Sequence, residues 1–105
     1  KGDNMIIHNR EMGYGTDYSE FFGALSKAKE YLENKYPELS MELMYNLAGE
    51  RRRVTIQTRY NSLADYERID AEVDQDEGYS KLLESIITDN VFPIVDQFYR
   101  VIQTN

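Results

Sequence analysis

The sequence predicts an α+β domain in which strands and helices follow the order β-α-β-β-α(α)-β. The 105 residues fit one domain with a core of its own. Two segments in the middle of the chain alternate apolar and polar residues with the two-residue period of strands, and two further segments near its ends are interpreted as strands. The segments between them carry apolar residues at helical spacing. No linker, repeat or low-complexity stretch divides the chain. We therefore expect a single domain over residues 1–105.

The first part of the chain predicts one strand and one long helix. The strand covers Met5 to Met12, and a turn with two glycines follows at residues 13–16. Asp17 and Glu20 have the spacing of a capping box at the start of the helix. One face of this helix carries apolar residues at helical spacing: Phe21, Leu25, Ala28, Leu32 and Tyr36. Pro37 then ends the helix.

Two alternating segments in the middle of the chain predict a hairpin. The first runs from Leu39 to Ala48 and the second from Arg52 to Tyr60, with a tight connection at Gly49 and Glu50. In these strands the residues on one face are Met41, Leu43, Tyr45 and Leu47, followed by Val54, Ile56, Thr58 and Tyr60.

The last part predicts two helices and a final strand. Ser62 caps a helix that runs to about Val73, and a polar break at residues 74–78 separates it from a second helix. The apolar residues of the second helix are Tyr79, Leu82, Leu83, Ile86 and Ile87. Pro93 ends that helix, and Ile94 to Gln103 forms the last strand.

This order of elements is that of the ferredoxin-like split β-α-β fold. The helix between the first two strands requires them to be parallel, either adjacent or one strand apart. Right-handed crossovers then place the helices on one face of a four-stranded antiparallel sheet. The other face of the sheet is left uncovered.

Alternation divides the strand residues between the two faces. Leu43, Tyr45, Val54 and Ile56 are expected to face the helices. The uncovered face is expected to carry Ile6, His8, Arg10, Glu42, Met44, Thr55, Gln57 and Arg59. The last strand adds either Phe98, Arg100 and Ile102 or Tyr99 and Val101. A partly apolar face of this kind indicates an interface, and a second copy of the chain is its simplest cover. We therefore expect a homodimer.

The segment from Tyr60 to Glu72, followed by Asp76-Glu-Gly-Tyr79 and Leu82-Leu83, resembles the second helical half of the dimeric α/β-barrel proteins, and most of all the NIPSNAP-like group. The resemblance implies two ferredoxin-like sheets packed face to face, enclosing small pockets. Members of that superfamily include cofactor-independent monooxygenases, lactone isomerases, haem enzymes and proteins of no known activity. The monooxygenases often use a cavity tryptophan, and the haem enzymes a histidine in a later segment. This chain has no tryptophan, and its one histidine is His8.

His8 is the candidate catalytic residue because histidine titrates near neutral pH and can act as a general base. Glu42 or Arg59 on the same predicted face would set its charge. Arg10 and Arg59 could clamp a carboxylate or enolate. The alternative roles are a polar interface contact for His8 and interface ion pairs for the arginines. The predicted ligand-binding residues are Arg10, Glu42, Gln57, Arg59 and Tyr99.

Composition excludes several other functions. A net charge of −7 argues against nucleic acid and against an anionic membrane surface as partners. The chain has no cysteine, and motifs for zinc, calcium, nucleotide phosphates or a serine nucleophile are absent. We therefore expect a cytoplasmic protein without metal or cofactor. Two hypotheses remain: a dimeric protein that binds or converts a small polar or aromatic metabolite in a cavity on the uncovered, inner sheet face, as a cofactor-independent oxygenase or isomerase would, or a non-catalytic dimerisation module.

Overall fold

The structure, a computed structural model, describes residues 5–15, 18–49, 52–86 and 91–102. It contains the predicted order of elements: β1 (Ile6–Tyr14), α1 (Tyr18–Lys35), β2 (Ser40–Tyr45), β3 (Arg53–Tyr60), α2 (Leu63–Asp74), α3 (Glu77–Ile86) and β4 (Val91–Arg100). The predicted cap of α2 is confirmed, because the Ser62 hydroxyl accepts a hydrogen bond from the Asp65 amide. The capping box predicted at Asp17 lies outside the described residues.

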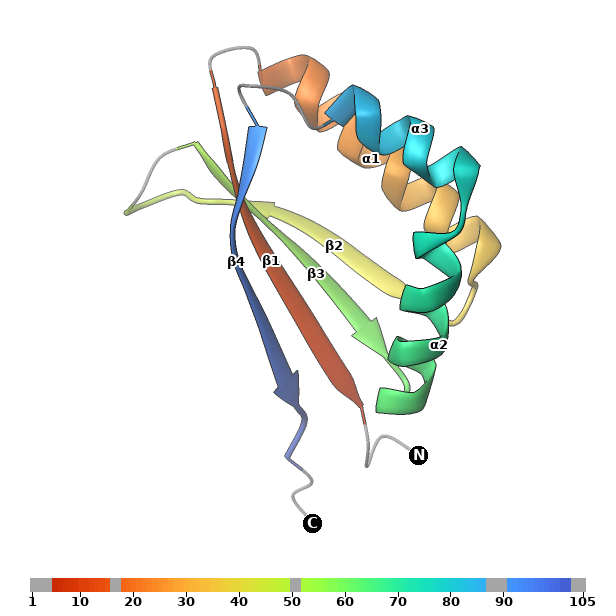
Figure 1. Cartoon of the computed structure of the whole chain (residues 1–105). Helices are drawn as coiled ribbons and strands as arrows, with labels where there is room; N and C mark the ends of the chain where they lie inside the picture. The colour runs from red at the N-terminus through yellow and green to blue at the C-terminus, as the bar shows by residue number, and fades with distance from the viewer. Residues whose placement is uncertain (1–4, 16–17, 50–51, 87–90, 103–105) are drawn as a thin grey trace.

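The four strands form one antiparallel sheet in the order β2-β3-β1-β4. β1 and β2 are both antiparallel to β3, so they run parallel to each other with one strand between them. All three helices lie on one side of this sheet (Figure 1). The predicted ferredoxin-like α+β architecture is therefore confirmed, and one face of the sheet is free of helices.

The prediction that Pro93 ends the last helix is wrong. α3 ends at Ile86, and Pro93 lies inside β4. β4 is an edge strand, where a residue without an N–H group removes no essential hydrogen bond. Glu11 of β1 pairs with Val95 and Met12 with Pro93, so one extra residue, Ile94, forms a bulge.

The predicted hairpin connection is longer than expected. β2 ends at Tyr45 and β3 begins at Arg53. Gly49 has a φ angle of 85°, a conformation that favours glycine. Gly49 thus lies in the turn, as predicted, and its backbone conformation explains why glycine stands there. The strands on either side are shorter than predicted.

The predicted facing of β1 is wrong. His8 pairs with Thr58 and Arg10 with Ile56 in the register between β1 and β3, and directly paired residues share a face of the sheet. Ile6, His8 and Arg10 therefore face the helices rather than the uncovered side. The two faces of β1 are similar in polarity, so alternation alone did not distinguish them.

The core consists of two groups of buried side chains under α1. One group contains Met12, Phe21, Leu25, Ala28 and Val54. The other contains Leu32, Tyr36, Leu39 and Ile69. The residues that α1 was predicted to bury are all buried, and they contribute to both groups. One of them, Tyr36, directly follows the last residue of the helix. α1 thus connects the two halves of the core.

Asp76 joins α1 to the junction between α2 and α3. Its carboxylate accepts hydrogen bonds from the Tyr79 amide at 3.1 Å, the Tyr31 hydroxyl at 2.8 Å and the Lys35 ammonium at 2.6 Å. The Lys35 contact, followed by those of Tyr79 and Tyr31, lowers the pKa of Asp76 to about 2. A Cβ atom on Gly78 would lie 2.6 Å from the Tyr31 hydroxyl oxygen, so a side chain there would displace the hydroxyl that binds Asp76.

Replacing Asp76 by Asn tests the charge of this junction. Asn can still cap α3, but it loses the ion pair with Lys35. Because folding lowers the pKa of Asp76 from 3.8 to about 2, the stabilisation is complete above pH 4 and disappears as the pH falls through 2. We expect D76N to unfold more easily than the wild type near neutral pH and equally easily near pH 2, measured by urea denaturation. A stability difference that does not change with pH would contradict this expectation, and E84Q, which removes an exposed carboxylate from α3, is the control.

Replacing Ile69 by Ala tests the second core group. Ile69 is 1% exposed and holds α2 against Leu32, Tyr36 and Leu39. We expect I69A to lower the free energy of unfolding by about 2–5 kcal/mol and I69V by about 0.5–1.5 kcal/mol. The matched control is L63A, because Leu63 is exposed on the same helix and its truncation should cost much less. Equal losses for I69A and L63A would show that α2 does not close the core.

Candidate functional site

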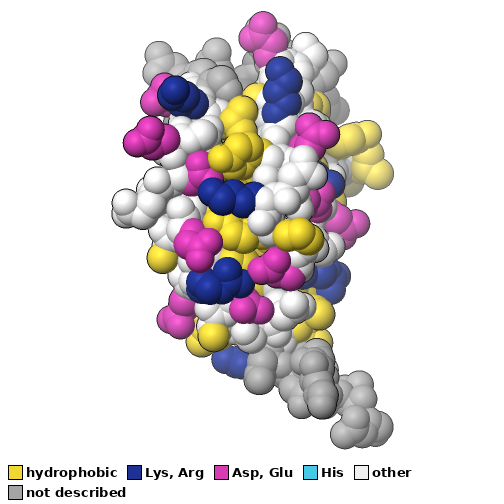
Figure 2. All heavy atoms as spheres, turned by 90° about the vertical axis from the view of Figure 1, so that its right-hand side faces the viewer, with side chains coloured by type: hydrophobic (Ala, Val, Ile, Leu, Met, Phe, Trp, Pro, Cys, Tyr) yellow, Lys and Arg dark blue, Asp and Glu magenta, His cyan; other side chains and the backbone are white. Residues whose placement is uncertain are grey.

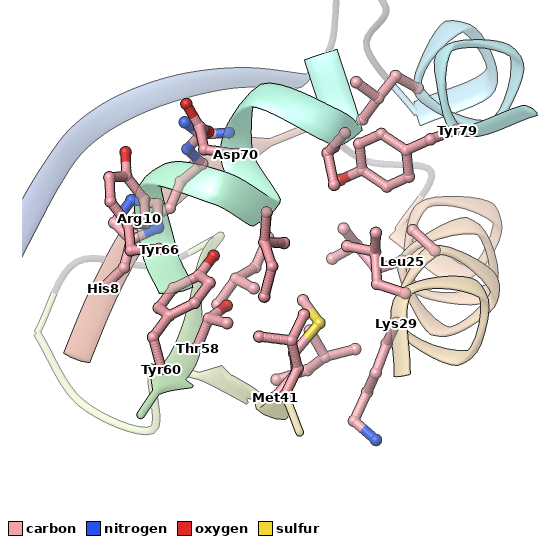
Figure 3. A pocket seen from close by; sticks show the side chains of 18 of the residues that line it. His8, Arg10, Leu25, Lys29, Met41, Thr58, Tyr60, Tyr66, Asp70 and Tyr79 are labelled. Carbon is pink, nitrogen blue, oxygen red and sulfur yellow. The ribbon is translucent and has the colours of Figure 1, made fainter. Parts of the chain in front are cut away.

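A cavity of about 340 Å³ lies between the helix-facing side of the sheet and the helices (Figure 3). Its volume is in the range of small-molecule sites. β1, β2 and β3 form one wall, and α1, α2 and α3 form the other. Leu25 from the first core group and Leu32 and Ile69 from the second all line it. The cavity therefore occupies the space where the two parts of the core meet.

One end of the cavity is apolar and the other is polar. Leu25 and Met41 lie at the apolar end, whereas His8, Arg10 and Tyr66 come together at the polar end (Figure 3). The polar end lies beside β4, an edge strand of the sheet, because His8 pairs with Phe98 and Arg10 with Asp96. Phe98 of β4 is 49% exposed there. Seen from the helix side, apolar side chains show between charged ones (Figure 2). At the polar end, the Arg10 and Asp96 side chains are 47% and 40% exposed, whereas His8 is 14% exposed, so solvent reaches the first two most.

Asp96 of β4 binds both His8 and Arg10. Its Oδ1 atom lies 2.9 Å from His8 Nε2 and 2.7 Å from Arg10 Nε, and its Oδ2 atom lies 3.3 Å from an Arg10 Nη atom. The hydrogen bond from Arg10 is the largest cause of a lowered pKa at Asp96. The same contact raises the pKa of Arg10. Asp96 is therefore ionised near neutral pH, and it orients both side chains of β1.

Four aromatic rings pack together beside this carboxylate. The His8 ring stacks on Phe98 with centroids 4.4 Å apart and planes 8° apart. Tyr66 meets Phe98 edge to face at 5.1 Å and also meets Tyr60 edge to face at 5.1 Å. These contacts hold the imidazole between an aromatic wall and a carboxylate, which restricts its orientation.

The tyrosine hydroxyls of the cavity stay protonated near neutral pH. Burial is the main cause that raises the pKa of Tyr60 to about 12. Burial also raises the pKa of Tyr66 and of Tyr79, whose ring lines the cavity from α3. The phenols are therefore neutral groups that can donate a hydrogen bond to a ligand.

The structure divides the predicted site residues between the two faces of the sheet. His8 and Arg10 line the cavity. The other four lie on the uncovered face: Glu42, Gln57, Arg59 and Tyr99. There Arg59 donates to Gln57 at 3.4 Å, and the Tyr99 hydroxyl donates to Gln97 at 2.8 Å.

Two predicted roles are corrected by this division. Arg10 and Arg59 lie on opposite faces and cannot clamp one ligand. Glu42 and Arg59 cannot set the charge of His8, and Asp96 is its partner instead. The last strand turns Phe98 toward the helix side, because Phe98 pairs with His8, and therefore turns Tyr99 to the uncovered face.

The sequence prediction placed the cavity on the uncovered face, whereas it lies on the helix side. It did not name Asp96 or Tyr66 as site residues, and it counted Tyr79 only among the apolar residues of its helix. A signal for Asp96 existed, because one alternative for β4 turned Phe98 to the same face as His8, and Asp96 is two residues before Phe98. Within the described ranges, no three side chains of the kind that bind metals are grouped at one point. None of the helices in that part of the chain is long and apolar enough to cross a membrane.

No model of a protein family matches the chain, and no curated protein matches its sequence. Solved structures do match. SnoaB from Streptomyces nogalater, a cofactor-independent oxygenase, has a TM-score of 0.74 with 9% identity over 96% of each chain. An uncharacterised NIPSNAP-like domain protein from Burkholderia xenovorans has a TM-score of 0.72 with 13% identity, over 97% of this chain and 87% of that one.

A NIPSNAP family protein of unknown function from Agrobacterium tumefaciens has a TM-score of 0.72 with 14% identity, over 94% of this chain and 87% of that one. At these identities the likeness shows the fold alone. The predicted resemblance to NIPSNAP-like proteins is confirmed at that level. The chain has the ferredoxin-like fold that the oxygenase SnoaB and the NIPSNAP proteins share.

Proposed function

We propose that this protein binds a small polar or aromatic metabolite in the cavity beneath its helices and that His8 moves a proton on the bound molecule. The observation that carries the proposal is the position of His8, which lines the cavity while Asp96 holds its Nε2 atom. A cavity of about 340 Å³ is more space than a non-catalytic dimerisation module needs. The cavity therefore favours the small-molecule hypothesis over the interaction module.

The contact with Asp96 prepares the imidazole as a base. The ionised carboxylate can only accept a hydrogen bond, so neutral His8 places its proton on Nε2. The lone pair on Nδ1 is then available to take a proton from a ligand. After that transfer, the adjacent carboxylate stabilises the imidazolium, and the phenol of Tyr60 or Tyr66 can donate to an oxygen of the ligand.

Proton transfer of this kind is the chemistry of a cofactor-independent oxygenase or of an isomerase. The shared fold with SnoaB, which is described as a cofactor-independent oxygenase, supports that class. The proposal assigns catalytic contact to His8 and a positioning role to Asp96 and Arg10, and it requires no metal or cofactor.

We propose in addition that the uncovered sheet face joins two copies of the chain. Met44 and Tyr99 are 40% and 46% exposed on this face, and Val95 is exposed beside Tyr99. The amide oxygen of Asn9, also on this face, is buried and has no hydrogen-bond partner among the described residues. Exposed apolar side chains on this face, together with an unsatisfied polar atom, support a contact with a second chain.

The single histidine allows a direct test of the proposed base. In ¹⁵N-labelled protein, we expect the His8 ring to show the tautomer with the proton on Nε2, and D96N to lose that preference. Small aromatic ligands found by ligand-observed NMR should shift the His8 ring signals. For any ligand that is converted, H8Q should lower turnover by about 10²–10⁴-fold and change the dissociation constant little.

E84Q, which removes a carboxylate outside the cavity, is the control for D96N. Ligands that bind without affecting the His8 signals would contradict the proposed site. Full turnover in H8Q would refute the role of His8 as the base and leave the binding site standing.

Replacing Met44 by Asp tests the dimer. A carboxylate in place of an exposed methionine would lose its water in the contact, so we expect M44D to be monomeric at concentrations where the wild type is dimeric. The matched control is L63D, because Leu63 is equally exposed but lies on the helix side, in the first turn of α2. Light scattering coupled to size exclusion gives the mass. A monomeric wild type, or dissociation by L63D as well, would contradict this use of the sheet face.

A further inference from the structure

The cavity carries an unbalanced charge. Arg10 and Lys29 line the cavity, but each is already paired with a carboxylate outside the lining. Arg10 lies 2.7 Å from Asp96, and Lys29 lies 2.8 Å from Glu33. Asp70 of α2 also lines the cavity and, within the described part of the chain, has no basic side chain within 4.0 Å.

Asp74, one turn farther along α2, lines the cavity in the same way and likewise has no basic partner among the described residues. The two paired cations contribute no net charge, because each has its own carboxylate. Counted together with Asp96 and Glu33, four carboxylates and two cations lie in or beside the lining, which is a surplus of two negative charges. A positively charged ligand is attracted to it, and an anion is repelled.

The aromatic wall has the same preference. The faces of aromatic rings are electronegative, and an ammonium group placed over them is attracted. Tyr60 and Tyr66 meet at 82° beside Asp70 on the polar side of the cavity (Figure 3). Burial is the main cause that raises the pKa of both hydroxyls. The charge of Asp70 is a further cause at both, so the carboxylate lies close to both rings.

The remaining wall limits the rest of the ligand. Leu25, Met41 and Leu43 line the apolar end, where a hydrocarbon or aromatic body can be buried. The charge of Arg10 is already paired with Asp96 through two hydrogen bonds, which leaves it less attraction for a carboxylate ligand. The cavity thus combines an acidic, aromatic end with an apolar one.

We propose that the ligand of this cavity is an organic cation: an amine, protonated or quaternary, attached to an apolar or aromatic body. Its ammonium group lies between Asp70, Asp74 and the rings of Tyr60 and Tyr66, and its body lies against Leu25 and Met41. This inference rests on the proposed small-molecule site and adds to it the charge of the ligand.

Three probes with the same phenyl body separate the charges: phenethylammonium, neutral phenylacetamide and anionic phenylacetate. Titrations followed by NMR at neutral pH give their dissociation constants for the full chain. We expect phenethylammonium to bind about tenfold more tightly than phenylacetamide, and phenylacetate to bind most weakly. Added salt should weaken the binding of phenethylammonium and leave the binding of phenylacetamide unchanged.

Variants connect the preference to the two carboxylates. We expect D70N and D74N each to weaken the binding of phenethylammonium about three- to fivefold without changing the binding of phenylacetamide. Both side chains are exposed at the cavity rim, so the variants should fold, and E84Q is the control for loss of a carboxylate elsewhere.

Equal or tighter binding of phenylacetamide or phenylacetate would overturn the cation proposal while the small-molecule site stands. Tighter phenethylammonium binding that D70N and D74N leave unchanged would also overturn it, because the charge would then act from another place. If none of the probes bound, both this inference and the proposed site would be refuted for ligands of this size.

Discussion

The register of β1 is the constraint on which the rest of the structure depends. β1 lies between β3 and β4, so the hydrogen bonds of both neighbours determine which of its side chains face the helices. A shift by one residue would turn His8 and Arg10 to the uncovered face and bring Ile7, Asn9 and Glu11 under the helices. The register therefore decides whether a cavity with an imidazole exists at all.

Asp96 compensates the positive charge that this register brings to the helix side of the sheet. Without it, the helix side of the sheet would hold the guanidinium of Arg10 next to an aromatic cluster with no paired charge and only solvent to compensate it. With it, one carboxylate neutralises Arg10, orients His8 and leaves the imidazole packed on Phe98. The interactions that stabilise the polar end of the cavity are thus the same ones that fix the orientation of the His8 ring.

The cavity also explains the division of the core. A domain of this size would be more stable if the space between its two buried groups were filled. Instead α1 connects the two groups along its length, and the junction at Asp76 holds α2 and α3 against it from the far side. Helices held at both ends can cover an open space without collapsing into it. This arrangement is typical of a binding site, where stability is given up for function.

The elements of this fold and their order were determined by the sequence alone, because helix and strand periods and the cap at Ser62 are local properties of the chain. The same local patterns placed Glu42, Met44, Gln57 and Arg59 correctly on the uncovered face. Only the tertiary structure decided the facing of β1 and the pairing of His8 with Asp96. The two faces of β1 are similar in polarity. Asp96, the partner of His8, is 88 residues away along the chain, so no local pattern contains that information. Hydrogen bonding across the assembled sheet supplies it.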